Sequence, residues 1–126
     1  MKLDVDCLID VLFAVEANTG PFQYWDVHFE SGEGLNAYTQ REVYYHVQQA
    51  ISAGLVQVEA EFIDGTIEIS DLTMRGHAAL SSVRNPAVRW KAKNEWLSRV
   101  LSGLVDASIA GFFGLAAEIA KTAILQ

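Results

Sequence analysis

The side chains that most often carry out chemistry are few in this chain and widely spaced. It contains three histidines and one cysteine, and His28, His46 and His77 fall in three different predicted elements. No His-x-x-x-His or Cys-x-x-Cys pair occurs, so a metal site would have to be assembled wholly by folding. His46 interrupts an apolar helix face and His77 follows a helix start. We therefore expect both to be structural, hydrogen-bonded to neighbouring groups.

The remaining reactive residues also lack a catalytic pattern. No phosphate loop, nucleophile elbow or Gly-x-Gly-x-x-Gly motif follows a predicted strand. The carboxylates of Glu59 and Glu61 alternate along a predicted strand, where a solvated face is the simpler interpretation. Cys7 has no basic neighbour at helical spacing to lower its pKa, so we expect a small buried side chain rather than a nucleophile. The sequence thus predicts no enzymatic activity, no metal and no cofactor.

Length and composition indicate one globular domain with an appendage. The chain has 126 residues, of which 51% are hydrophobic and 20% charged, which is an ordinary folded mixture. Residues 1–72 hold thirteen acids and two bases, and residues 73–126 hold seven bases and three acids. Their net charges of −11 and +4 give the total of −7. Residues 1–72 therefore favour a basic partner, and residues 73–126 favour an acidic one.

The same residues bear on localisation. A single cysteine fits a reducing cytosol, and Asp4, Asp6 and Asp10 interrupt the first apolar residues, which argues against a secretory signal. In the apolar C-terminal region the longest uncharged run, residues 107–117, is shorter than the roughly 20 residues that cross a bilayer. We expect a cytoplasmic protein that does not enter the membrane.

The strongest local signal is a helix over residues 39–53. Thr39 and Glu42 have the spacing of a capping box, and Gly54 supplies a left-handed stop. The face predicted to be buried is formed by Val43, His46, Val47, Ala50 and Ile51, at spacings of three and four. The other faces carry Gln40, Arg41, Tyr44, Gln48 and Gln49.

The elements around this helix predict an α+β, winged-helix-like domain over residues 1–84. We expect a helix at 4–17 and a strand at 24–29 before it, and strands at 55–62 and 66–69 after it, joined by a turn at Asp64-Gly65. In the first strand of this wing, alternation predicts a buried face formed by Val56, Val58, Ala60 and Phe62. The order is thus helix, strand, helix and two-stranded wing.

Residues 85–126 are expected to form a helical extension. Either Asp71 or Thr73 could cap the preceding helix, which ends before Asn85-Pro86, and Pro86 suits the first turn of the next helix. An apolar stripe follows, with a break expected near Gly111 to Gly114. We predict that this stripe packs within the chain or forms a homodimer through Trp96, Leu104, Phe112, Phe113 and Ile119.

The segment Leu72-Thr73-Met74-Arg75-Gly76-His77-Ala78-Ala79-Leu80, continuing to Val88-Arg89-Trp90, resembles a family of small bacterial proteins common in phages and prophages, a domain of unknown function. The starting Met1-Lys2-Leu3-Asp4, the Tyr45-His46-Val47 run, the Ala53-Gly54-Leu55-Val56 run and the apolar C-terminal helix agree with that family in order. The resemblance implies a winged-helix-like domain with a helical extension and an origin in a mobile element. It implies no reaction.

These observations favour a protein that acts by binding another protein, as a regulator or a modulator of host functions. The alternative is a transcriptional regulator that contacts DNA through the helix at 39–53 or the basic segment 84–99. Its contact residues would be Gln40, Arg41, Tyr44, Gln48, Arg89 and Lys93. Residues 55–71, however, carry five acids and no lysine or arginine, and such a wing would be repelled by phosphates.

Overall fold

The computed structural model describes residues 1–31, 35, 37–103 and 108–125. The chain divides into two compact units, residues 1–77 and residues 78–126. This division lies within helix α3 (Met74–Val83), whereas the sequence places the domain boundary after the helix, between residues 84 and 85. The boundary of the independently folding part stays a prediction, and the two units are described separately below.

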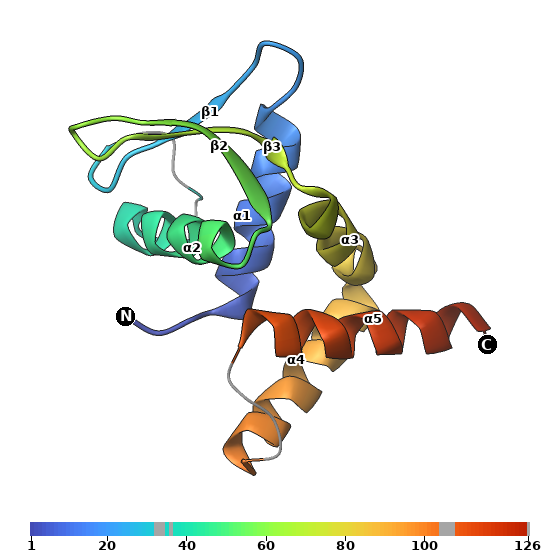
Figure 1. Cartoon of the computed structure of the whole chain (residues 1–126). Helices are drawn as coiled ribbons and strands as arrows, with labels where there is room; N and C mark the ends of the chain where they lie inside the picture. The colour runs from blue at the N-terminus through green and yellow to red at the C-terminus, as the bar shows by residue number, and fades with distance from the viewer. Residues whose placement is uncertain (32–34, 36, 104–107, 126) are drawn as a thin grey trace. The chain divides into compact units, whose positions relative to one another are not determined.

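Unit 1 combines two helices with a small antiparallel sheet (Figure 1). Along the chain the order is helix α1 (Val5–Asn18), strand β1 (Trp25–Val27), helix α2 (Gln40–Ser52), strand β2 (Val56–Glu61) and strand β3 (Ile67–Leu72). The strand order is β1-β3-β2. Helix α1 packs against α2 and β3, and α2 packs against β2. The fold class is therefore α+β, as predicted, and the element order is consistent with a winged-helix-like arrangement.

Both predicted ends of α2 are confirmed. The Thr39 hydroxyl accepts from the Glu42 amide at 3.2 Å, and the Glu42 carboxylate accepts from the Thr39 amide at 3.1 Å. At the other end Gly54 has φ +72°. The Gly54 and Leu55 amides donate to carbonyls of the last turn, those of Ile51 and Ala50, which is the Schellman pattern. Local sequence alone thus sets the length of this helix.

The core of unit 1 lies between α1, α2 and the inner face of the sheet. Eight of the fourteen residues of α1 are buried, so this helix is covered over more than one narrow face. From α2 the buried residues are Val43, His46, Val47 and Ala50. The sheet contributes Trp25, Val27, Val56, Ile67, Ile69 and Leu72, which alternate except between Ile69 and Leu72, where the register shifts between Gln57 and Val58.

The burial of β2 alternates as predicted from Val56 to Glu61, with Val58 and Ala60 half-buried and the residues between them exposed, but its pairing with β3 is irregular. Val58 lies opposite Ile69, but the next pairs are Ala60 with Glu68 and Glu61 with Ile67, because the register shifts between Val58 and Ala60. Residues that lie opposite each other share a face. The pairing therefore directs Glu61 to the side of Ile67 and Ala60 to the side of Glu68, although Glu61 at the end of the strand remains exposed and Ala60 is half-buried. Phe62, expected to be buried, is 52% exposed.

Unit 2 contains helices α4 (Pro86–Leu101) and α5 (Ile109–Leu125), which pack on each other. Asn85 caps α4 by accepting from the Ala87 amide at 2.9 Å, and Pro86 occupies the first turn as predicted. The break expected near Gly111 to Gly114 is wrong, because both glycines lie inside α5. Helix α4 instead ends at Leu101, before Gly103 with φ +73°. Among the described residues, no helix is long and apolar enough to cross a membrane.

Candidate functional site

The three histidines occupy three separate environments. Within the described part of the chain, no group of three His, Cys, Asp or Glu side chains is placed to hold a metal ion. His28 Nδ1 accepts from the Glu30 amide at 3.1 Å, so Nε2 is the nitrogen that donates to the Asp64 carbonyl at 3.0 Å. This imidazole ties the end of β1 to the turn between β2 and β3.

His46 is structural, in agreement with the sequence-based expectation. It is 1% exposed, and its Nδ1 lies 2.7 Å from the Glu42 carbonyl oxygen while its Nε2 lies 2.8 Å from the Asp4 amide. The amide can only donate, so Nε2 accepts and Nδ1 carries the proton. Both ring nitrogens are therefore used, and the imidazole joins the residue that caps α1 to the middle of α2.

Cys7 is also accounted for by the core. Its side chain is fully buried, and Sγ lies 4.0 Å from the Glu42 carbonyl oxygen. Burial, followed by the nearby carboxylates of Asp4, Glu42 and Asp10, raises the pKa of the thiol from 9.0 to about 12. The thiolate, which is the nucleophilic form, is thus strongly disfavoured at neutral pH.

Three of the four α2 residues named as possible base contacts are held by the chain itself. The Gln40 amide donates to the His28 and Ser31 carbonyls at 2.7 and 3.3 Å. The Tyr44 hydroxyl donates to the Gly65 carbonyl at 2.7 Å. Arg41 lies 3.7 Å from Glu30, with both side chains largely exposed. These contacts direct the first half of α2 toward the β1 end and the hairpin turn.

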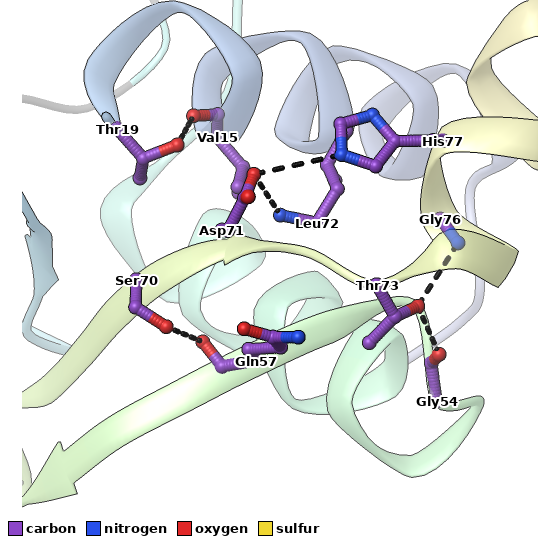
Figure 2. Close-up of polar contacts among 10 residues, drawn as sticks. All are labelled: Val15, Thr19, Gly54, Gln57, Ser70, Asp71, Leu72, Thr73, Gly76 and His77. Atoms are coloured by element: carbon purple, nitrogen blue, oxygen red, sulfur yellow. Dashed lines mark hydrogen bonds and ion pairs between the residues drawn. The ribbon is translucent and has the colours of Figure 1, made fainter. Parts of the chain in front are cut away.

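Figure 2 shows the polar contacts that hold the segment with Thr73, Gly76 and His77, which carries the family resemblance. Thr73 Oγ1 donates to the Gly54 carbonyl at 2.6 Å and accepts from the Gly76 amide at 3.0 Å. The second bond makes Thr73 the cap of α3 and decides between it and Asp71. The Thr73 amide also donates to the Leu55 carbonyl at 3.0 Å. This threonine therefore joins the start of α3 to the end of α2.

The glycine and histidine of the same segment serve the same junction. A Cβ atom on Gly76 would overlap the Leu55 carbonyl oxygen, so no other residue fits without a backbone shift. His77 Nε2 lies 3.7 Å from Asp71 Oδ1, and both side chains are about half exposed. Asp71 Oδ1 also accepts from the Leu72 amide at 2.7 Å. Local geometry is thus sufficient to explain these residue types.

An open groove lies between α2 and the β2–β3 hairpin, with a volume of about 320 Å³. Its α2 wall is formed by Tyr44, Gln48, Ile51 and Ser52. Its hairpin wall is formed by Glu61, Phe62, Gly65 and Ile67. Tyr44 and Gln48 are thus brought together from the predicted contact residues, whereas Gln40 and Arg41 do not line this groove. We take it as one candidate functional site.

The electrostatics of this part of unit 1 are one-sided. Residues 42–74 contain six acids and no lysine or arginine. On the outer sheet face Glu68 lies directly opposite Asp26. Partial desolvation raises the pKa of Glu68 above its ordinary value, and the Asp26 and Glu59 carboxylates raise it further. The hairpin therefore carries acidic groups that no base of its own sequence neutralises.

In unit 2 most of the residues predicted to form an interface are buried within the chain. Trp96, Phe112 and Phe113 are 4%, 0% and 9% exposed. The Trp96 and Phe112 rings meet edge-to-face with their centroids 5.7 Å apart. Ile119 is only partly buried, and Leu104 lies outside the described residues. Of the two packing alternatives, the intramolecular one accounts for the three aromatic residues.

A different face of α4 is exposed. Trp90, Leu97 and Leu101 are 70%, 40% and 88% exposed, and spacings of seven and four place them on one side of the helix. The predicted anionic-contact residues Arg89 and Lys93 also lie on α4 and are partly buried. The spacing of the three apolar residues is visible in the sequence. The neighbouring residues in the sequence do not indicate that this side of α4, rather than the side of Trp96, faces solvent.

These features define a small α+β protein with a helix, strand, helix and hairpin order and a helical C-terminal part. Residues 2–102 match the model of a family described as a hypothetical protein (DUF2513), and the chain belongs to this family. No curated protein and no solved structure matches the chain. The resemblance to a domain of unknown function is thus confirmed, whereas an origin in phages stays a prediction. Two surfaces can support a function: the groove between α2 and the β2–β3 hairpin and the exposed apolar side of α4.

Proposed function

We propose that this is a non-enzymatic, winged-helix-like protein of phage or prophage origin that regulates its target by binding another protein molecule. The observation that carries the proposal is the exposed apolar face of α4, formed by Trp90, Leu97 and Leu101. Large apolar side chains aligned on one surface are a feature of interaction sites. A tryptophan among them is a typical binding anchor.

The charges beside this face limit the kind of partner. Arg89, Lys91 and Lys93 lie on the same helix, against the single acid Glu95, which pairs with Arg99 at 3.9 Å. A complementary surface would be apolar in its centre and acidic at its rim. A second copy of the chain is one such partner, since its residues 1–77 carry thirteen acids and three bases.

The test is a double substitution, Leu97→Asp with Leu101→Asp, in the full chain. The control is Ser98→Asp, which adds a charge at an exposed position of the same helix and leaves the three apolar side chains in place. Light scattering over a wide concentration range measures self-association, and affinity capture from the host measures other partners. We expect the double variant to lose a complex that the wild type and the control both form. A wild type that is monomeric and captures the same proteins as the double variant contradicts the proposal.

One observation favours the DNA-binding alternative: residues 75–99 hold six bases against one acid. Under this alternative Arg89 and Lys93 contact phosphates, while Gln48 is the α2 residue left to read bases. A gel shift with the DNA upstream of the gene tests it. A salt-sensitive shift that is abolished by Arg89→Glu with Lys93→Glu would establish DNA binding and displace the protein-binding proposal for this segment.

A further inference from the structure

The groove in unit 1 combines three kinds of group that meet at one place only because of the shifted register of β2. The pairing of Glu61 with Ile67 brings its carboxylate to the α2 side of the hairpin. Ile51 and Phe62 supply apolar surface beside it, and Gln48 and Ser52 supply exposed polar groups. Without the extra residue at the bulge, Glu61 would lie on the outer face of the sheet.

One end of the groove is fixed by contacts within unit 1. The Tyr44 hydroxyl bonds to the Gly65 carbonyl at 2.7 Å. Gly65 has φ +92°, and the Phe29 ring lies so close that a Cβ atom there would meet it at 3.1 Å. The Phe29 and Tyr44 rings are themselves in edge contact, with centroids 5.9 Å apart. A site with a preformed wall loses little entropy when a ligand binds.

The exposed apolar side chains belong to the same hairpin turn, in which the Gly65 amide donates to the Phe62 carbonyl at 2.9 Å. Phe62 is 52% exposed and Ile63 is fully exposed at the hairpin tip. Among the described residues, the Glu61 carboxylate has no ion-pair or hydrogen-bond partner, and the Glu61 side chain is exposed. A carboxylate beside an aromatic ring and an aliphatic side chain matches a lysine or arginine side chain, whose stem is apolar and whose head is cationic.

We propose that this groove binds a basic segment of a partner protein, with one arginine or lysine side chain anchored between Glu61 and Phe62 and an apolar neighbour on Ile63. Charge complementarity selects this occupant, because Glu61 is the one charged residue among the described residues that line the groove, and residues 1–77 as a whole carry a net charge of −10. The same charge disfavours nucleic acid and acidic peptides. The site is independent of the α4 face, so each can fail without the other.

The experiment uses the full chain, isotope-labelled for NMR, and a short synthetic peptide with alternating arginine and leucine. A second peptide in which glycine replaces leucine tests the apolar contribution. We expect the first peptide to shift the amide resonances of Gln48, Ile51 and Phe62. Glu61→Gln should weaken its binding tenfold or more. Glu59→Gln, which removes the same charge from the other side of the bulge, should weaken it less than about threefold.

Melting temperatures of both variants show whether the fold is retained, and Phe62→Ser provides a second, uncharged test of the same site. Equal losses for Glu61→Gln and Glu59→Gln would mean that only net charge matters and would overturn the proposal. Absence of shifts at these residues with millimolar peptide would overturn it as well. Self-association that Glu61→Gln abolishes would assign the groove to a second copy and would also overturn it.

Discussion

At the scale of single residues, His46 contributes through hydrogen bonds rather than through chemistry. Replacement by alanine removes the acceptor of the Asp4 amide and leaves a cavity between α1 and α2. We expect His46→Ala to lower the free energy of unfolding by about 2–4 kcal/mol. His77→Ala is the control, since its partly exposed pair with Asp71 is worth at most about 1 kcal/mol. Urea unfolding measures both, and similar losses would contradict this assignment.

Gly76 gives the sharpest steric prediction. Because a Cβ atom there would overlap the Leu55 carbonyl oxygen, Gly76→Ala should cost about 3 kcal/mol or more. The matched change is Gly114→Ala in α5, where a Cβ atom would meet nothing within 4 Å. That substitution should stabilise the chain by up to about 1 kcal/mol. Thermal unfolding of the two variants would refute the steric account if their effects had the same sign.

At the scale of helices and strands, some features of the fold could be predicted from local sequence and others could not. The ends of α2 and the helix start at Pro86 depend on residues within four positions, so local patterns predicted them. The shifted register of β2 depends on its pairing with β3, which no local pattern of Glu59 and Ala60 encodes. The groove was therefore missed, although two of its α2 residues, Tyr44 and Gln48, were named for another purpose.

The sheet also yields a prediction about pH. The raised pKa of Glu68 means that the folded state holds this proton more tightly than the unfolded state does. Stability should therefore fall as pH rises from the ordinary glutamate pKa through the raised one. Glu68→Gln should remove this part of the pH dependence and leave the protein at least as stable at pH 7.

Urea titrations at several pH values between about 4 and 7 would test this sign. Glu118→Gln, on an exposed part of α5, is the control and should leave the profile of the wild type unchanged. A Glu68→Gln variant that is less stable than the wild type at pH 7 would show that the carboxylate has a stabilising partner instead.

At the scale of the whole molecule, charge is distributed by unit. Residues 1–77 carry a net charge of −10 from thirteen acids and three bases, and residues 78–126 carry +3 from six bases and three acids. Repulsion within the acidic unit opposes folding, and salt screens it. We expect sodium chloride to raise the melting temperature of the transition that involves unit 1, followed by circular dichroism. Sucrose at equal osmolality controls for solvent exclusion, and a melting temperature that falls with salt would contradict the prediction.

The surface that buries Phe112 and Phe113 could not be predicted from the sequence. Both belong to a stripe whose spacing is evident, but the spacing is the same whether the covering surface is Trp96 of the same chain or a second copy. Only the folded arrangement of α4 and α5 decides it. For the same reason the exposed line of Trp90, Leu97 and Leu101 could not be separated from the core positions of α4.

Because Cys7 is buried, the rate at which its thiol is modified can report local opening of the native protein. Cys7 is the only cysteine, it is fully enclosed, and its pKa of about 12 suppresses the reactive form even when reagent is present. A thiol reagent can therefore modify the native protein only during excursions that separate α1 from α2. The labelling rate, compared with that of the unfolded chain, gives the free energy of those excursions. A ligand that stabilises unit 1 would slow the labelling, so the same reaction would also report binding of the ligand.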